Sequence, residues 1–401
     1  MTGPGGSRVA IVGAVRTPIG KFGGKLRMTP ATTLGTFVAG EALRRARVAP
    51  ADIPEVVFGH CIQAGTGQNP ARQVLRGAGI PDSSGAVTIN MVCGSSMKAL
   101  HLATAEIRAG EFDLVLAGGM ESMDSAPFLV SPKARWGMRY GGEPLDDAML
   151  RDALVDAYGE HEHMGFTGER IARKLGLTRN DLDRFGARSH QRAAEAITKG
   201  YFATESVPIP PSLTATREGL GSDEGPRGDS TVESLSTLKP SFSKDGLLTA
   251  GNSSQLSDGA AAIVLASEAA VASRSLTPLA WIHSSQVGGV DPADVMEAPI
   301  PTVRAHLKRV GIAPKELDRV EHNEAFASAS IAVQRAFGFT EDQFNVHGGA
   351  IALGHPIGAS GTRIVVTLVH ELLRTKGQLG LATLCMGGGN GLSLIVDRRG
   401  L

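Results

Sequence analysis

The sequence predicts an α/β fold with mainly parallel strands, because two kinds of pattern alternate along most of the chain. Short β-branched runs that stop at glycine, such as RVAIVG at 8–13, are typical of buried strands. Longer stretches with apolar residues at helical spacing follow them, beginning with ATTLGTFVAGEALRRARV at 31–48. With 401 residues, the chain is long enough for two or three domains.

Three further strands and one helix follow in the first third of the chain. Strand patterns occupy EVVFGHCI at 55–62, AVTINMVC at 86–93 and DLVLAGG at 113–119. Residues 96–110, SMKALHLATAEIRAG, have apolar side chains at helical spacing and end in glycine. This pattern predicts a helix together with its stop signal.

The composition changes between about Ser125 and Ser254, where charged residues, proline, methionine and serine become more frequent. Irregular stretches such as 208–230 alternate with helical patterns such as DLDRFGARSHQRAAEAI at 181–197. We interpret this part as an insertion of loops and helices that contacts the substrate, since long irregular segments are often functional.

The α/β pattern then resumes. We expect SDGAAAIVLAS at 257–267 to be helical at its start and strand-like at its end. The remaining patterns predict a strand at 279–287, helices at 302–311, 328–338 and 361–377, and a hairpin with a glycine-rich turn at 380–397.

The two ends of the chain resemble each other. Cys93 precedes a helix that leads into a strand ending at Gly118 and Gly119. His355 likewise precedes a helix that leads into a strand ending at Gly387–Gly389. We interpret this as a weak internal duplication, which would place both turns at a shared centre.

The composition argues against several function classes. Lys plus Arg and Asp plus Glu number 40 each, so no overall basic surface is available for nucleic acid or a membrane. No apolar run is long enough to predict a membrane span. Three cysteines argue against a disulfide framework and for a reducing compartment. MTGPGGSRVA lacks a secretory pattern and is expected to be a frayed tail, so we predict a cytoplasmic protein.

Cys93 is the first candidate for chemistry. It precedes a predicted helix, whose free N–H groups and dipole favour the thiolate, the nucleophilic form of cysteine. The small Gly94, Ser95 and Ser96 leave room for an acyl group. The alternative is a buried structural cysteine, which is the commoner fate of a free thiol.

Three other residues lie in informative surroundings. His355 in GGAIALGHPIGASGTR is held in glycine-lined backbone and suits a base directed at a thiol, the alternative being a turn histidine. Cys385 in TLCMGGGNG precedes glycines whose N–H groups suit an oxyanion, the alternative being a core cysteine. Asn323 in VEHNEAFA offers an amide for a water or a carbonyl oxygen, unless it caps a helix.

The sequence predicts neither a metal site nor a nucleotide-binding loop. HEH at 161–163 is an isolated pair of histidines without a C-x-x-C partner. GGGNG lacks the strand, helix and downstream acid of a dinucleotide-binding loop, and the chain has no Walker-type Gly-Lys-Ser/Thr.

Five motifs fall in one order along nearly the whole chain: NMVCGSSMKAL, AGNSSQLSDGAA, NEAFA, GGAIALGHPIGASG and CMGGGNG. Together they resemble the thiolases, which include acetyl-CoA acetyltransferases and 3-ketoacyl-CoA thiolases. The resemblance implies a fold of duplicated α/β halves, with mixed sheets layered by helices, and an inserted loop domain. The N-terminal half would span 1–125, completed by 255–277, the inserted CoA-binding domain 126–254, and the C-terminal half 278–401.

The resemblance also implies a mechanism. Cys93 would carry the acyl group, His355 would activate its thiol, and Cys385 would move the α-proton. Asn323 would hold a water that binds the thioester oxygen together with His355, and the N–H groups of Cys93 and Gly387 would form a second oxyanion hole. The implied reaction joins two acetyl-CoA into acetoacetyl-CoA and CoA by Claisen condensation, or cleaves 3-ketoacyl-CoA by thiolysis, in ping-pong order.

Coenzyme A would be a substrate, with no permanently bound cofactor and no metal. Arg227 suits a phosphate or an adenine face, and His163 and Met164 would line the pantetheine tunnel. Surface or core packing is the alternative for each expected contact. The full set that matches the family is His163, Met164, Arg227, Ser234, Leu238, Phe242, Ala250, Ser254, Ala325 and Phe326.

The sequence departs from the family pattern outside the catalytic set. We expect these departures to bear on acyl chain length. They are His322, His347, Phe166, Gly168 and the pair Glu297–Ala298.

The motifs oppose two other functions. A decarboxylating condensing enzyme would use Cys-His-His and a carrier protein, which the Cys385 motif opposes. A non-catalytic CoA-binding or lipid-binding relative is opposed by the presence of Cys93 and His355 together with Cys385.

The resemblance implies a homodimer or homotetramer, with SPKARWGMRYGG at 131–142 a candidate contributor to the tetramer.

Overall fold

The computed structural model describes residues 7–138 and 140–401. Residues 1–6 of the expected frayed tail, and Arg139 within 131–142, lie outside the described residues. The described strands are Val9–Arg16 (β1), Gly20–Lys21 (β2), Glu55–Gly59 (β3), Gly85–Ile89 (β4), Leu114–Ser122 (β5), Phe128–Leu129 (β6), Asp146–Asp147 (β7), Ser257–Ser267 (β8), Ala280–Gly289 (β9), Arg319–His322 (β10), Leu379–Met386 (β11) and Asn390–Asp397 (β12). The described α-helices are Ala31–Ala46 (α1), Pro70–Gly77 (α2), Ser95–Ala109 (α3), Met164–Lys174 (α4), Arg179–Thr198 (α5), Val232–Ser236 (α6), Glu268–Ser273 (α7), Pro299–Val310 (α8), Ala327–Phe337 (α9), Ala350–Leu353 (α10) and Ser360–Thr375 (α11).

A ten-stranded sheet repeats one topology twice. Its N-terminal part has the order β4-β3-β5-β8-β1, with parallel β3–β4 and β3–β5 pairs and antiparallel β5–β8 and β8–β1 pairs. Its C-terminal part has the order β10-β11-β12-β9, parallel at β10–β11 and antiparallel thereafter. A parallel bridge between Val320 and Phe344 stands where β4 stands in the first part. The predicted duplication is therefore confirmed.

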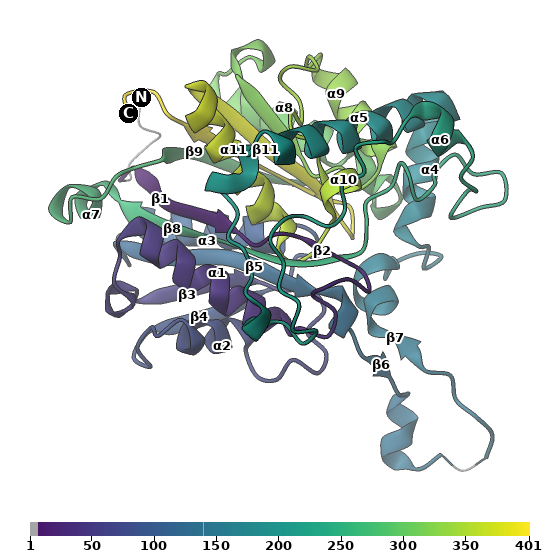
Figure 1. The fold of residues 1–401 in the computed structure, drawn as a ribbon, viewed down its shortest axis with the longest axis horizontal. Coiled ribbons are helices and arrows are strands. Elements are labelled where there is room, and N and C mark those ends of the chain that lie inside the picture. Colours follow the sequence, from purple (N-terminus) through teal and green to yellow (C-terminus); the bar gives the residue numbers. More distant parts are fainter. Residues whose placement is uncertain (1–6, 139) are drawn as a thin grey trace.

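Three apolar cores separate the layers of helices and strands. The central core joins α3 and α11 to strands of both parts of the sheet. The second joins α1 and α2 to the other face of the N-terminal part, and the third joins α8 and α9 to the other face of the C-terminal part. Figure 1 shows the two parts one above the other. They are linked edge to edge where β1 pairs antiparallel with β9.

The expectation of mainly parallel strands is wrong, because six of the nine pairings in the large sheet are antiparallel: β8, β9 and β12 run against their neighbours. Two expected elements also differ from the structure. Residues 257–267 form the strand β8 throughout, so the expected helical start is wrong. β8 lies between β1 and β5 and is buried on both faces, and such a strand shows no alternation, while its alanines imitate a helix. The strand expected at 86–93 ends at Ile89, and Cys93 lies in the turn that follows.

The chain between β5 and β8 carries short strands and helices α4–α6. Its first part, with β6 and β7, forms an arm that projects away from the sheet in Figure 1. Its later part is tied to β1 by Arg16, a fully buried guanidinium. Arg16 Nε donates to Oε1 of Glu205 at 2.6 Å, and its Nη1 and Nη2 donate to Asp223 at 2.7 and 2.9 Å.

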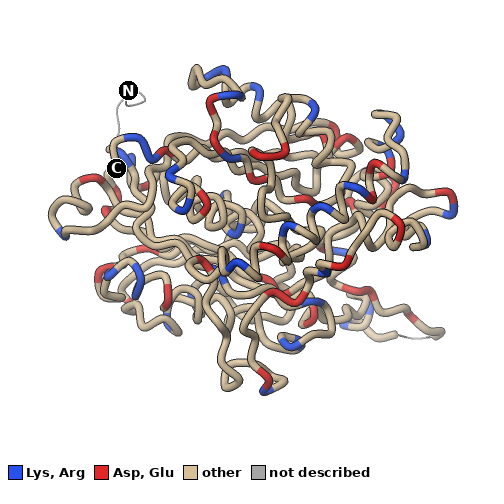
Figure 2. The backbone as a smooth tube through the Cα atoms, turned by 45° about the horizontal axis from the view of Figure 1, so that its top comes forward, with Lys and Arg blue, Asp and Glu red and all other residues tan. Residues whose placement is uncertain are grey.

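Charged residues of both signs are interspersed along the backbone in Figure 2. Among the described residues, no helix has the length and apolar character needed to cross a membrane.

Replacing Glu205 with alanine should destabilise the fold by about 3–5 kcal/mol, because it leaves part of the Arg16 charge buried without a partner. Urea unfolding of the Glu205→Ala protein measures this. The matched control is Glu268→Ala, which removes the exposed partner of Arg8 and should cost about 0–1 kcal/mol. Equal losses in the two variants would contradict the prediction.

Candidate active site

Cys93 lies in a strained turn directly before α3. Val92 has a φ of +48°, which β-branched residues rarely adopt, and its N–H donates to Oδ1 of Asn90 at 3.0 Å. Ser95 holds the same turn, because its Oγ donates to the carbonyl oxygen of Val92 at 2.6 Å and accepts the N–H of Met91 at 2.9 Å. The half-buried Cys93 side chain is thereby fixed at the N-terminal end of α3.

His355 faces Cys93 from the other half of the molecule. Its Nε2 lies 3.3 Å from the Sγ of Cys93, and its Nδ1 lies 2.6 Å from the Oγ of Ser360. The Ser360 hydroxyl donates to the carbonyl oxygen of Pro356 at 2.9 Å, so its oxygen is free to accept a hydrogen bond from the N–H at Nδ1. This tautomer leaves the lone pair of Nε2 directed at the thiol, as a base requires.

The N-terminal ends of α3 and α11 bring the two residues together. The N–H of Thr362 donates to Oγ of Ser96 at 2.9 Å, and its Oγ1 donates to the carbonyl oxygen of Ser96 at 3.1 Å. The approach needs glycine at 361, where a Cβ atom would lie 2.6 Å from the backbone nitrogen of Met97. The shared centre expected from the duplication is this contact.

Asn323 joins the same centre. Its Nδ2 lies 3.3 Å from Nε2 of His355, and its fully buried Oδ1 has no hydrogen-bond partner among the described residues. A buried amide oxygen of this kind calls for a donor such as water. The alternative role as a helix cap does not apply, because α9 begins only at Ala327.

Cys385 and Gly387 close the centre from the β11–β12 turn. Cys385 is buried near the end of β11, with its Sγ 3.8 Å from Sδ of Met296. Gly387 lies against the turn of Cys93, since a Cβ at this position would lie 3.3 Å from Cγ1 of Val92, and its N–H acts to lower the pKa of Cys93. The turn itself needs glycine, since Gly388 and Gly389 have φ values of +81° and +82°.

Burial keeps these groups neutral. It raises the pKa of Cys93 to about 12, against the smaller opposing effect of the N–H groups of Gly387 and Cys93. Burial, and then the charge of Arg363, lowers the pKa of His355 to about 3. Burial also raises the pKa of Cys385 to about 12. The expected preference of the helix end for a thiolate is therefore outweighed, and the resting pair is a thiol beside a neutral imidazole.

Several of the predicted CoA contacts lie together. The His163 ring stacks on Phe242 with centroids 5.1 Å apart, and Phe242 meets Phe326 edge-on at 5.8 Å. The N–H of Ser254 donates to the carbonyl oxygen of Ala325 at 3.0 Å. Met164 belongs to the same apolar core as Phe242 and Phe326.

The other predicted contacts are more dispersed. Arg227 donates its N–H to Nδ1 of His190 on α5, and Ser234 forms a capping box with Thr231 at the start of α6. Leu238 packs beside Gly251, next to the exposed Ala250. Within 7–138 and 140–401, no hydrogen bond or ring contact joins the four predicted contacts of this paragraph to the aromatic group formed by His163, Phe242 and Phe326. The four are Arg227, Ser234, Leu238 and Ala250.

The departures from the family pattern occupy different surroundings. His322 is fully buried and stacks on Phe344, whereas Phe166 is exposed. The Nε2 of His347 lies 2.7 Å from Oε2 of Glu371, in a hollow of about 350 Å³ lined by charged residues. Gly168 and Glu297 are nearer the site. A Cβ at Gly168 would lie 3.0 Å from the Phe326 ring. Glu297 directly follows Met296, whose sulfur contacts Cys385, and its carboxylate pairs with Lys174 at 2.5 Å.

Sequence reasoning missed two supporting residues. Ser360 lies in the same motif as His355, five residues further on, so its spacing was an available signal. Glu121 ends a buried apolar strand with a carboxylate, and a charge in such a run signals a requirement for hydrogen bonds.

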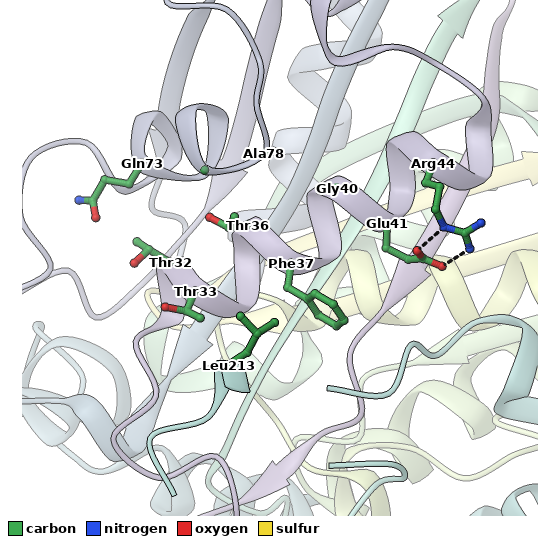
Figure 3. Close-up of a pocket in the computed structure, with 11 residues that line it drawn as sticks. Thr32, Thr33, Thr36, Phe37, Gly40, Glu41, Arg44, Gln73, Ala78 and Leu213 are labelled. Atoms are coloured by element: carbon green, nitrogen blue, oxygen red, sulfur yellow. Dashed lines mark hydrogen bonds and ion pairs between the residues drawn. The ribbon is translucent and has the colours of Figure 1, made fainter. Parts of the chain in front are cut away.

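Other features of the surface carry no comparable chemistry. A hollow of about 650 Å³ lies between α1, α2 and Leu213, away from Cys93, and its lining contains neither thiol nor imidazole (Figure 3). In the described part of the chain, no group of three or more His, Cys, Asp or Glu side chains is arranged to hold a metal ion.

Comparison with known proteins identifies the family. Residues 9–269 match the family model of the thiolase N-terminal domain, and residues 276–398 match that of the thiolase C-terminal domain. The chain belongs to the thiolase family. An acetyl-CoA acetyltransferase of Pseudomonas aeruginosa is 47% identical over 391 residues, covering 97% of this chain and 99% of the relative. One from Escherichia coli K12 is 45% identical over 388 residues, covering 97% and 98%.

Solved thiolase-family structures share the fold over nearly the full length. The Bacillus anthracis acetyl-CoA acetyltransferase superposes with a TM-score of 0.95 at 40% identity, covering 98% of this chain and 100% of that one. Human mitochondrial 3-ketoacyl-CoA thiolase in complex with CoA gives a TM-score of 0.93 at 38% identity, covering 98% of each. The predicted fold of duplicated α/β halves is confirmed.

Alkylation of Cys93 by iodoacetamide should rise about tenfold per pH unit between pH 6 and 9, because its raised pKa keeps the thiol protonated across this range. A preformed thiolate–imidazolium pair would instead react at a rate independent of pH. Cys61 is the internal control and should react more slowly, because it is only 2% exposed and burial raises its pKa. Peptide mass spectrometry after timed labelling measures both rates.

Proposed function

We propose that this thiolase is a CoA-dependent acyltransferase that converts two acetyl-CoA into acetoacetyl-CoA and CoA, and that cleaves 3-ketoacyl-CoA in the reverse direction. The observation that carries this proposal is the 3.3 Å contact between Sγ of Cys93 and Nε2 of His355, with Cys385 in the same centre. The acetyl-CoA acetyltransferases among its relatives support acetyl-CoA as the substrate.

In the first half-reaction, Cys93 takes the acyl group. The Sγ proton moves to Nε2 of His355 as Sγ attacks the thioester carbonyl. CoA leaves as a thiolate and takes up the proton of the Cys385 thiol, which leaves Cys385 as a thiolate. Thiol and thioester exchange is nearly balanced in energy, because one thioester replaces another. The N–H groups of Cys93 and Gly387 receive the oxyanion of the intermediate.

In the second half-reaction, the Cys385 thiolate removes the α-proton of a second acetyl-CoA. The enolate oxygen is held by the protonated Nε2 of His355 and by a water on the amide oxygen of Asn323, which has no partner among the described residues. The enolate carbon attacks the acyl carbon on Cys93, a C–C bond forms, and the Cys93 sulfur leaves and takes back its proton from His355. Burial that raises the pKa of Cys385 also makes its thiolate a stronger base, which suits proton removal from carbon.

The chain would hold CoA as a substrate, with no permanently bound cofactor. We propose residues 126–254 as the CoA-binding domain, inserted between a half formed by 1–125 with 255–277 and a half formed by 278–401. The aromatic group of His163, Phe242 and Phe326 supports this. It joins two residues of the inserted segment to Phe326, which lies three residues after Asn323 and directly before α9. The remaining contacts proposed are Met164, Arg227, Ser234, Leu238, Ala250, Ser254 and Ala325.

The assembly we propose is a cytoplasmic homodimer or homotetramer. β4 is an edge strand of the large sheet and its Val87 is 39% exposed, which suits pairing with a second copy. The arm carrying β6 and β7 supports further association, because it projects from the molecule with Trp136 84% exposed and Tyr140 fully exposed (Figure 1).

Replacing Cys93 with alanine should abolish acetoacetyl-CoA formation and the acetyl mass on the peptide that contains residue 93. Replacing Cys385 with serine should leave that acylation in place but slow condensation by about 100-fold or more, because a hydroxyl is a poor acid and base here. Mass spectrometry after incubation with acetyl-CoA, and a steady-state assay, separate the half-reactions. Cys61→Ser is the control, and a Cys93→Ala protein of normal activity would refute the proposal.

Replacing Trp136 and Tyr140 together with serine should convert a tetramer to a dimer, because it removes apolar area from the arm. Light scattering coupled to gel filtration measures the mass. Met28, which is 67% exposed outside the arm, provides the control Met28→Ser. An unchanged tetramer in the double variant would contradict a role of the arm.

A further inference from the structure

Glu121, the next-to-last residue of β5, is a fully buried carboxylate that the two half-reactions leave without a role. Its Oε2 accepts the N–H of Gly358 at 2.9 Å and that of Cys61 at 3.1 Å. Its Oε1 accepts the N–H of Ile62 at 3.3 Å and lies 3.1 Å from Nε2 of His60. Burying a carboxylate is costly, and these three N–H donors offset that cost.

The donors belong to both halves of the molecule. Gly358 lies in the loop that runs from His355 to α11, whereas Cys61 and Ile62 follow β3. The loop fits closely, because a Cβ at Gly358 would lie 2.4 Å from the carbonyl oxygen of Met120. The carboxylate therefore fastens the His355 loop to the end of β5, three residues from the imidazole.

The charge of Glu121 also acts on Cys93. Burial is the main cause of the raised pKa of Cys93, and the charge of Glu121 adds to it. The other groups that face the pair are the thiols of Cys61 and Cys385, and Arg363 of α11, whose charge acts on His355. The anion beside Arg363 is Glu321, at 3.8 Å, so the charge of Glu121 is directed at the thiol.

We propose that Glu121 is a positioning residue for the acyl-transfer step. Its hydrogen bonds fix the His355 loop opposite Cys93, and its negative charge disfavours a free Cys93 thiolate, so that Sγ keeps its proton until Nε2 takes it. The carboxylate itself exchanges no proton. The proposal rests on the roles of Cys93 and His355 proposed above.

Two variants separate the two effects. Glu121→Gln keeps the size but removes the charge and turns one acceptor into a donor that faces N–H groups. Its kcat should fall about 10–100-fold with little change in KM for acetyl-CoA, and the alkylation profile of Cys93 should shift to lower pH. Glu121→Asp keeps the charge but shortens the reach to Gly358. Its kcat should fall while the alkylation profile stays at the wild-type pH.

Glu169 provides the matched control. It is a buried carboxylate of α4 that accepts the N–H groups of Leu247 and Leu248 at 2.8 Å each. Glu169→Gln should lower stability in urea unfolding without moving the alkylation profile of Cys93, so it measures the purely structural cost of such a change.

The results that overturn the proposal are distinct from those that overturn the function. A Glu121→Gln protein with the stability loss of Glu169→Gln but wild-type kcat and alkylation profile would make Glu121 merely structural. If Glu121→Gln does not fold, a Glu121→Asp protein with wild-type kcat overturns the proposal. An active Cys93→Ala protein would contradict the proposed function itself. If Cys93→Ala is inactive but the Glu121 variants behave like the wild type, only the inference about Glu121 is contradicted.

Discussion

The structure depends on the meeting of two helix N-termini at the centre of the molecule. α3 and α11 come from different halves, and the hydrogen bonds between Ser96 and Thr362 hold their first turns together. Because the loop before each helix must then end at the same place, Cys93 and His355 become neighbours although 262 positions separate them. The central core includes residues of both helices and of strands from both parts of the sheet, and this packing holds the helices in place.

The same burial that fixes the pair determines how it works. Removing the thiol and the imidazole from water favours their neutral forms, so proton transfer is left to the moment when a carbonyl carbon can accept the sulfur. Electrostatic partners act strongly in such a site because little water screens them. This explains why so much of the surrounding polarity is backbone N–H and buried carboxylate.

Sequence patterns predicted the centre better than its surroundings. Cys93, His355 and Cys385 lie in short glycine-rich stretches, and these stretches can be recognised from the sequence without knowing what they contact. The strand β8 was misread at its start because burial on both faces removes alternation, and alanine is compatible with either state. Glu121 and Ser360 carry signals in the sequence, but their partners do not, since Gly358 lies 237 positions from Glu121 and the bond between Ser360 and His355 depends on a tautomer. Arg227 and Ser234 matched a motif but have only local partners in the described structure.

The two halves share a topology but use one position of it in opposite ways. The connection that follows the third parallel strand reaches the centre in both, as β5 to β8 in the first half and β11 to β12 in the second. In the second half it is a tight glycine turn, which places Gly387 against Val92, next to Cys93. In the first half it is the long inserted segment, which leaves from the strand that carries Glu121 and returns where Ser253 forms a bridge with Phe326. The duplicated fold thus provides a short connection beside the nucleophile proposed above, and a long one with room for the proposed CoA-binding segment.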